Sequence, residues 1–411
     1  METERLYRID QYAVSNESII HSIINKDGYD VICVDKSVFF PEGGGQPSDT
    51  GTISRGNEVF EITHVFDNDL YEDVFHITDA PFGTFHIGDE VTLTIDWDKR
   101  FSNMQRHLGE HMLSGTLHTL YGGINKGFHM GEEYITIDID LGGRLLTEDE
   151  IDLAEIKVNE AIWENLPVTT SWFDNYKDSL VMPVRKTTPH DGKVSVVTVG
   201  EKDSPYDCIA CCGTHPSYSA EVGLLSVYKV EPNKGMNRIY FDCGINALKK
   251  LKENKYLLDN ISKRYSCSPQ DLSGRLNSIN DEISQIKQSN ATLTNYVNNA
   301  ELKKILNELE CNKTRIYSCN IDIISVDELL KLGFSVIESV KDKLLILVHD
   351  KTKTALLFSS CELKCGLLVK EYASSFNGRG GGKDDNARAV FTTSKDLTGF
   401  ISKIKELNGG D

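Results

Sequence analysis

Two pairs of metal-ligand residues limit how this chain can fold. His107 and His111 stand four residues apart in RHLGEHMLSG, and Cys211 and His215 stand four residues apart in CCGTHP. Residues at i and i+4 lie on one face of a helix or within one tight turn, so both members of a pair can reach one ion. Three imidazoles and one thiolate suit Zn²⁺ better than Mg²⁺ or Ca²⁺, which prefer oxygen ligands. We therefore predict a fold that brings these two distant stretches together around one zinc ion.

The bulk composition is that of a globular chain. At 411 residues, with 39% hydrophobic and 26% charged residues, it is long enough for two or three domains. The first residues, METERLYRID, lack an apolar segment, and Leu344–Val348 is too short to span a bilayer, so we expect a cytoplasmic protein. The ten cysteines do not form the dense pattern of a small disulfide scaffold. A net charge of −18 argues against nucleic-acid binding, although binding follows the local potential rather than the sum.

Residues 1–95 alternate apolar and polar side chains over short runs, which predicts a small β-barrel. Within this region lies FFPEGGGQPSDTG, where Gly43, Gly44 and Gly45 free the backbone to approach a ligand closely. The amide of Gln46, directly after the glycines, can both donate and accept a hydrogen bond toward a substrate.

Residues 96–243 contain both ligand pairs and are expected to form a zinc-binding α+β core. The pattern predicts a helix over residues 100–122 that carries His107 and His111, and a second helix over 148–165. Strands are expected near residues 194–199, 224–230 and 238–243, with CCGTH forming a turn between them.

Residues 244–309 are expected to be helical. A heptad seam runs through Leu272, Leu276, Ile279, Ile283, Ile286, Asn290, Leu293 and Val297. An antiparallel helical hairpin, with its break at residues 266–269, is the simplest interpretation. Pairing with a second copy, giving a homodimer through this segment or the C-terminal domain, is the alternative.

Residues 310–411 alternate strands and helices, which predicts a C-terminal α/β domain and completes an α+β multidomain chain. The segment FNGRGGGKDD lacks the spacing of a nucleotide-binding phosphate loop. A glycine nest flanked by Arg379 and Lys383 could still hold an RNA phosphate.

Several motifs in one order carry a resemblance to a known family. They are FPEGGGQPSDTG, TIDWDKR, HLGEHMLSG, GFHMG, CCGTHP and RIYFDCG. This set resembles the editing domain of alanyl-tRNA synthetase and its free-standing relatives, the AlaX family. In addition, GRGGGKDDNARA resembles the glycine motif of the DHH-associated domain, as in the long form of AlaX. The sequence departs from the family pattern at Cys212, where glycine is usual, and this bears on the geometry of the turn.

The resemblance implies editing in trans, because residues 1–95 leave no room for a synthetase catalytic domain ahead of the barrel. The implied substrate is tRNA(Ala) mischarged with serine or glycine, and the implied reaction is hydrolysis of the aminoacyl ester. The implied cofactor is Zn²⁺, held by His107, His111, Cys211 and His215.

The remaining site residues are less constrained by the sequence. Candidate catalytic residues are Gln46, Glu110 and Thr214. Glu110 points about 100° from His111 on a regular helix, so a surface position is expected for it. Candidate substrate-binding residues are Gly43, Gly44, Gly45, Thr116, Arg379 and Lys383, with Thr116 and Thr214 nearest for recognising a seryl hydroxyl. Because four protein ligands fill a tetrahedral site, a catalytic, a substrate-anchoring and a structural zinc all remain open.

Other functions share some of these residues. His107, Glu110 and His111 also spell HxxEH, a zinc metalloprotease signature with Glu110 as base, which needs a further carboxylate ligand and leaves Cys211 and His215 unexplained. An oligonucleotide phosphodiesterase is a second alternative, but the sequence contains no Asp-His-His motif, which such an enzyme requires. A non-catalytic RNA-binding protein stabilised by zinc is the third alternative.

Overall fold

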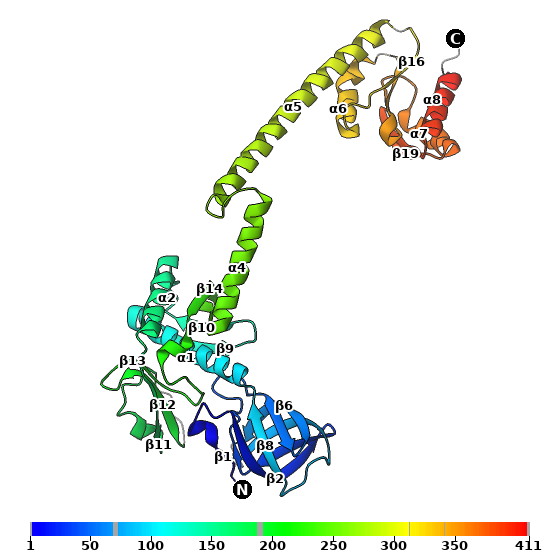
Figure 1. Cartoon of the computed structure of the whole chain (residues 1–411). Coiled ribbons are helices and arrows are strands. Elements are labelled where there is room, and N and C mark those ends of the chain that lie inside the picture. The colour runs from blue at the N-terminus through cyan, green and yellow to red at the C-terminus, as the bar shows by residue number, and fades with distance from the viewer. Residues whose placement is uncertain (1, 69–72, 187–191, 312, 341, 409–411) are drawn as a thin grey trace. The chain divides into compact units, whose positions relative to one another are not determined.

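The computed structural model describes residues 2–68, 73–186, 192–311, 313–340 and 342–408 (Figure 1). The chain forms two compact units, Met1–Ile261 and Ser262–Asp411. The expected mixture of a barrel, helices and further sheets is confirmed. The finer division at residues 95, 243 and 309 stays a prediction.

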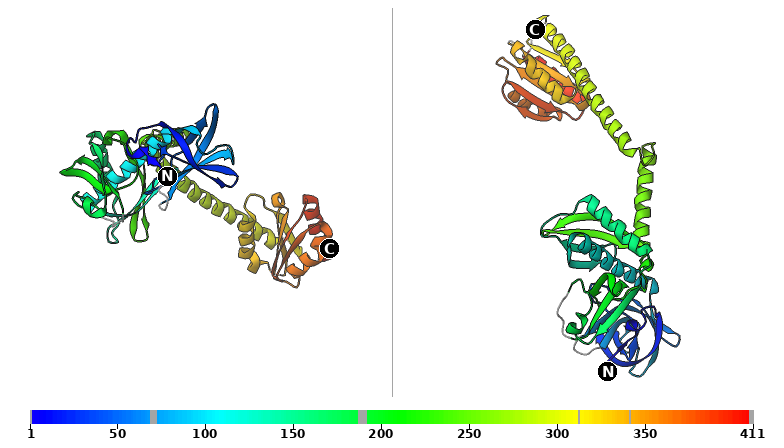
Figure 2. Two further views of the ribbon diagram at one scale, coloured as in Figure 1. Left: turned by 90° about the horizontal axis from the view of Figure 1, so that it is seen from below. Right: turned by 90° about the vertical axis from the view of Figure 1, so that its left-hand side faces the viewer.

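A closed barrel of six strands opens the first unit (blue in Figures 1 and 2). The strands pair in the order β2-β3-β7-β6-β5-β8, and a short parallel pair, β1 (Glu4–Arg5) with β4 (Lys36–Ser37), lies outside it. In β8 the side chains of Val91, Leu93 and Ile95 are buried and alternate with more exposed ones, as the pattern predicts. The barrel strands are β2 (Ser15–Lys26), β3 (Tyr29–Val34), β5 (Gly51–Arg55), β6 (Glu58–Asn68), β7 (Asp73–Pro81) and β8 (Glu90–Ile95).

Helix α1 (Trp97–Tyr121) follows the barrel directly and confirms the predicted helix over residues 100–122. The Asp96 side chain caps its first turn by accepting the N–H of Lys99 at 3.1 Å. Gly122, at φ 71°, ends it in the left-handed conformation that glycine adopts without strain. Every residue from 106 to 117 is buried, so this part of the helix is enclosed on all sides.

Two antiparallel sheets surround α1. Leu108 and Met112 of α1 pack with Val158 of α2 and with Ile137 and Phe241 of the larger sheet. The larger sheet has the order β14-β15-β10-β9, and the smaller one β11-β12-β13. The elements are β9 (Ile124–Met130), β10 (Ile135–Asp140), α2 (Glu148–Trp163), β11 (Val168–Phe173), α3 (Tyr176–Ser179), β12 (Val194–Glu201), β13 (Ser204–Ala210), β14 (Leu225–Asn233) and β15 (Met236–Cys243).

A fully buried ion pair joins α1 to the barrel. The guanidinium of Arg100 donates from Nε to both oxygens of Asp49, at 3.0 and 2.9 Å, and from Nη2 to the carbonyl of Val38 at 2.6 Å. Both side chains have no exposed surface. Because Asp49 belongs to the segment PEGGGQPSD, this pair fixes the glycine-rich loop against the first turn of α1.

The second unit contains a five-stranded sheet with the order β16-β17-β18-β20-β19. Helix α6 and the end of α5 (Leu272–Cys311) cover one face, while α7 and α8 cover the other (Figure 2). Only β16 and β17 are parallel, so the sheet is mixed. The elements are β16 (Ile316–Asn320), α6 (Val326–Val336), β17 (Leu344–His349), β18 (Thr354–Ser359), α7 (Cys365–Tyr372), β19 (Arg379–Gly382), β20 (Asn386–Val390) and α8 (Ser394–Asn408).

The predicted glycine nest at residues 379–383 is wrong, because these glycines form the edge strand β19. A Cβ on Gly380 would lie 2.1 Å from the carbonyl oxygen of Arg388, and one on Gly382 would lie 2.3 Å from the Cα of Ala387. The glycines thus permit close pairing with β20, and none of them has a positive φ. Phosphate binding by Arg379 and Lys383 stays a prediction.

The helical segment consists of α4 (Gly244–Arg264), which contains the boundary between the units, and α5 (Leu272–Cys311). As the heptad pattern predicts, α5 is one continuous helix. Its seam residues Ile283, Ile286 and Leu293 are exposed. The hairpin and the pairing with a second copy both stay predictions. Among the described residues, no helix combines the length and apolarity needed to cross a bilayer.

We predict that Asp49→Asn lowers the free energy of unfolding by about 3 kcal/mol, because it leaves the buried Arg100 guanidinium without its counter-charge. Urea denaturation followed by tryptophan fluorescence measures this, since all three tryptophans lie in the first unit. Glu58→Gln, which breaks the exposed pair with Arg55, is the matched control and should cost less than about 1 kcal/mol. Equal losses in the two variants would contradict the anchoring role.

We also predict that the buried His76 makes the first unit sensitive to acid. Its Nδ1–H donates to the carbonyl of Ile32 at 3.1 Å, so Nε2 accepts from the Ser37 hydroxyl at 2.8 Å. Burial lowers the pKa of His76 to about 4. The unfolded chain therefore binds one more proton between pH 6.5 and 4, so stability present above pH 6.5 is lost as the pH falls, by about 3 kcal/mol in total.

The measurement compares the free energy of unfolding of the wild type and His76→Gln at pH 7 and pH 4.5. The variant keeps hydrogen-bonding groups at this position and cannot titrate, so its stability should fall less steeply. Identical pH dependence in both proteins would show that His76 does not carry the effect.

Candidate metal centre

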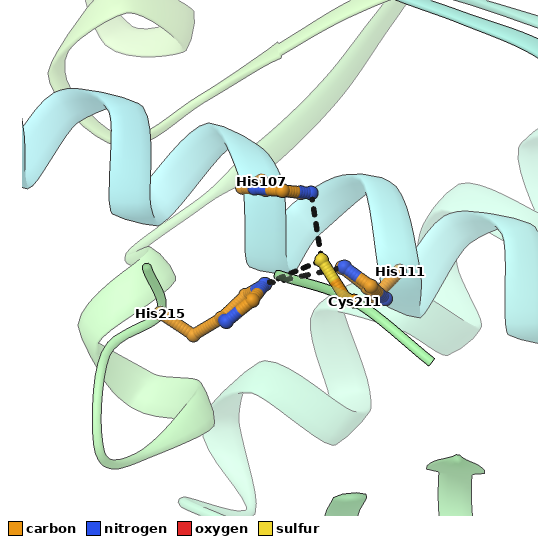
Figure 3. A group of neighbouring side chains, drawn as sticks. All are labelled: His107, His111, Cys211 and His215. Atoms are coloured by element: carbon orange, nitrogen blue, oxygen red, sulfur yellow. Dashed lines mark hydrogen bonds between the residues drawn. The ribbon is translucent and has the colours of Figure 1, made fainter. Parts of the chain in front are cut away.

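The two predicted ligand pairs meet in the first unit (Figure 3). His107 and His111 project from α1, and Cys211 and His215 from the loop after β13. Their ligand atoms all lie within 4.8 Å of one another. The Sγ of Cys211 lies 3.3 Å from His107 Nε2 and 3.7 Å from His215 Nε2, and the Nε2 atoms of His111 and His215 lie 3.2 Å apart. The four side chains could therefore hold one metal ion.

The three separations just given are close to those between ligands of a tetrahedral zinc ion. Zn–N bonds of about 2.0–2.1 Å and Zn–S bonds of about 2.3 Å place neighbouring ligand atoms about 3.3–3.6 Å apart. His111 and His215 face each other through their Nε2 atoms, and their Nδ1 atoms are buried without a hydrogen-bond partner in the described residues.

The protonation states also suit metal binding. Burial lowers the pKa of His107 to about 3 and holds the pKa values of His111 and His215 well below the ordinary value for histidine. The three rings are therefore neutral at pH 7 and offer lone pairs. Burial raises the pKa of the Cys211 thiol, so a bound cation is needed to stabilise its thiolate.

Gln46 sets the orientation of His107. The backbone N–H of Thr214 donates to Gln46 Oε1 at 3.1 Å, which identifies this atom as the amide oxygen. The same oxygen lies 2.9 Å from His107 Nδ1, so Nδ1 carries the proton and Nε2 keeps its lone pair for the cluster. Gln46 Nε2 in turn donates to the Thr214 hydroxyl at 2.8 Å. Gln46 and Thr214, predicted as catalytic residues, thus lie behind a ligand, and this arrangement favours a positioning role.

The glycine loop is shaped around these contacts. Gly43 and Gln46 exchange two backbone hydrogen bonds, and Gly44 and Gly45 have φ values of 61° and 83°. A Cβ on Gly45 would lie 2.5 Å from the ring of Phe128, which itself stacks on His107. Gly44 lines the cavity next to the ligands, and substrate binding by the three glycines stays a prediction. Cys212, the departure from the family pattern, lies against this loop, 2.9 Å from where a Cβ on Gly44 would be.

A cavity of about 190 Å³ opens beside the ligand cluster. His107, His111 and Cys211 line it, and so does Glu110. The expected surface position of Glu110 is wrong: its side chain is 5% exposed, because this part of α1 is enclosed on all sides. Burial raises its pKa. Both hydrogen bonds that the described residues donate to it, from Ser114 at 2.6 Å and Asn125 at 2.7 Å, reach Oε1, which leaves Oε2 without one.

Within the first unit, Thr116 does not belong to the ligand cluster or to its cavity. The Thr116 hydroxyl lies 2.8 Å from the carbonyl of Met112 and contacts the Tyr206 hydroxyl, and Thr116 lines a different cavity. Arg379 and Lys383 belong to the second unit. Substrate binding by these three residues stays a prediction.

Four further residues at the cavity were not predicted from the sequence. Three of them line it, Asn125, Phe128 and Arg185, and the fourth, Asp207, pairs with Arg185. Arg185 donates from Nε to Asp207 at 2.7 Å, in a pair that is almost fully buried. One signal was available: Asp207 is a charged residue within the short strand SPYDCIA, where a buried position requires a partner.

Comparison with known proteins supports the expected relationship. The chain is 28% identical over 393 residues to the alanyl-tRNA editing protein AlaX-L of Pyrococcus horikoshii, covering 94% of each chain. The expected resemblance to the AlaX family is confirmed. The family model described as tRNA synthetases class II (A) matches residues 8–99.

The chain also resembles alanine–tRNA ligases. It is 25% identical over 422 residues to the ligase of Methanosarcina acetivorans, covering 99% of this chain and 44% of that enzyme. It therefore spans less than half the length of such a ligase. Among solved structures, the C-Ala domain of Aquifex aeolicus alanyl-tRNA synthetase matches 23% of this chain and 91% of that domain, at 16% identity and a TM-score of 0.21, which is too low to support an argument.

We predict that Gln46→Ala weakens zinc binding about 10- to 100-fold while the fold persists, because His107 loses the partner that fixes its tautomer. Competition with a chromogenic chelator measures the affinity, and circular dichroism checks the fold. Gln285→Ala, at an exposed position of α5, is the control and should bind zinc as the wild type does. Wild-type affinity in Gln46→Ala would remove the positioning role.

Proposed function

We propose that this chain is an aminoacyl-tRNA deacylase that edits in trans, hydrolysing the ester of tRNA(Ala) mischarged with serine or glycine. The observation that carries the proposal is the convergence of His107, His111, Cys211 and His215 beside a cavity formed by α1, β9 and the glycine loop. Similarity to an alanyl-tRNA editing protein over nearly the full length of both chains supports it.

Zn²⁺ is the cofactor we propose for the four ligands, since three nitrogen donors and one sulfur donor favour it. When bound, it would supply a Lewis acid that polarises or anchors the ester. The protein orients the histidine ligands. Gln46 fixes His107, and the buried α1 holds both of its histidines in place.

Glu110 is the residue we propose to direct the attacking water. Ser114 and Asn125 hold one of its oxygens, and the other receives no hydrogen bond from the described residues, so it can accept one from water in the cavity. The seryl hydroxyl is not assigned to a partner, because Thr116 and Thr214 do not line this cavity.

The two rival functions find less support. A metalloprotease of the HxxEH type requires a carboxylate as a further ligand, whereas Cys211 and His215 already complete the group of four. A non-catalytic RNA-binding protein does not require a buried carboxylate beside the ligands. We further propose the alternative interpretation of the seam, in which the exposed heptad face of α5 pairs with a second copy of the chain.

We predict that the purified, zinc-loaded protein deacylates seryl- and glycyl-tRNA(Ala) and leaves alanyl-tRNA(Ala) and casein intact. His111→Ala and Cys211→Ala should lose zinc and about 1000-fold in rate, because the ester loses its electrophilic partner. Glu110→Gln should retain zinc and lose about 100-fold, because a general base is removed.

Release of radiolabelled serine measures the rate, and mass spectrometry measures the bound zinc. His86→Ala, an exposed histidine of the barrel, is the matched control and should behave as the wild type does. Cleavage of casein would favour the protease, while tRNA binding without deacylation would favour the non-catalytic alternative.

A further inference from the structure

Positive side chains gather at the cavity beside the metal ligands. Lys126, Arg185 and Lys186 line it, and Glu110 is its one carboxylate among the described residues. Both lysines are exposed, whereas the side chain of Arg185 is 7% exposed. Glu110 and the Asp207 carboxylate behind Arg185 offset two of these three positive charges, so the edge of the cavity keeps an excess of about one positive charge in a chain whose net charge is −18. Such an excess attracts an anion.

Arg185 is held in one orientation. It donates from Nε to Asp207 Oδ1 at 2.7 Å and from Nη2 to Oδ2 at 3.3 Å, and its backbone N–H donates to the carbonyl of Cys208 at 2.8 Å. The third nitrogen, Nη1, makes no hydrogen bond to the described residues, although an arginine offers five donors. A fixed guanidinium with free donors is therefore part of the cavity wall.

The surroundings of Asp207 leave no room for rearrangement. Its carboxylate packs against Gly115 of α1, where a Cβ would lie 2.8 Å from Asp207 Oδ1. Lys186 is likewise tied to the cavity, because its Nζ donates to the carbonyl of Asn125 at 3.2 Å. Since a buried ion pair is costly to desolvate and adds little stability, its position here is better explained by what Arg185 presents to the cavity.

We propose that Lys126, Arg185 and Lys186 form an anion-binding rim that holds the phosphate of the 3′-terminal nucleotide while the ester lies at the metal ligands. This inference rests on the proposed function. The aminoacyl group has a neutral ester and a positive α-ammonium, so the backbone phosphate is the anionic part nearest to the reacting bond. Arg185 gives this phosphate a directional partner, and the two lysines add charge at the edge.

The test measures binding of two stable probes to the zinc-loaded full-length protein. Both are adenosines that carry serine on the 3′ carbon through an amide, and only one has a 5′-phosphate. Titration calorimetry at low salt should give a dissociation constant about tenfold lower for the phosphorylated probe, because the rim adds charge-assisted hydrogen bonds. Arg185→Gln should reduce this ratio to about one or two.

The controls separate the rim from the fold. Arg144→Gln, which removes an exposed arginine paired with Glu150 outside this cavity, should keep the tenfold ratio. If Arg185→Gln loses zinc, the double variant Lys126→Gln, Lys186→Gln takes its place, because both lysines are exposed and should alter the ratio without unfolding. Equal affinities of the wild type for the two probes, or an undiminished ratio in these variants, overturns the proposal, as does failure of the phosphorylated probe to bind.

The probes cannot be hydrolysed, so the outcome is independent of catalysis. A phosphate preference without deacylation of seryl-tRNA(Ala) would retain the rim and reject the deacylase. Deacylation without a phosphate preference would retain the deacylase and reject the rim.

Discussion

The buried ion pair between Arg100 and Asp49 is the contact on which the candidate site depends. Taking both charges out of water is expensive, and the cost is offset only if the donors and acceptors are satisfied. Here Arg100 reaches Asp49 and the carbonyls of Val38 and Gln11, and Asp49 also accepts the N–H of Phe40. Asp49 lies in the same loop as Gln46, and Arg100 lies in the same helix as His107. The hydrogen bond between Gln46 and His107 therefore forms between parts that are already fixed.

Enclosure of α1 is the second constraint. A helix with one buried face can present two ligands and expose the residue between them, but α1 is buried through three consecutive turns. Glycines in α1 allow neighbouring side chains to pack closely against the helix. A Cβ on Gly109 would lie 2.2 Å from Cys243 Sγ, and Gly115 similarly admits Asp207. The same enclosure lowers the pKa values of the ligand histidines and holds Glu110 beside them.

The sequence predicted the features that depend on local spacing. The barrel strands, α1 and the two ligand pairs follow from periodicity and from the i, i+4 interval, which need no knowledge of distant contacts. The surface position expected for Glu110 was wrong because the angle between neighbouring side chains on a helix does not tell how many sides of that helix are packed against other elements. Arg185 and Asp207 were missed because their pairing is decided by tertiary packing. The glycines of β19 misled the prediction, since glycine serves close strand pairing as well as left-handed turns.

The charge distribution explains how an acidic chain can handle an acidic ligand. A net charge of −18 repels a polyanion at long range, while screening limits that repulsion to roughly 8–10 Å at physiological ionic strength. Within that distance the field is set by nearby groups. Beside the ligand cluster, the carboxylates of Glu110 and Asp207 are outnumbered by the positive side chains of Lys126, Arg185 and Lys186. Under the proposed function, an approach of the tRNA that brings its terminal phosphate to these three residues would therefore be favoured over other approaches. A negatively charged chain with positive side chains at the edge of this cavity would thus limit non-productive binding, which a uniformly basic chain would not do.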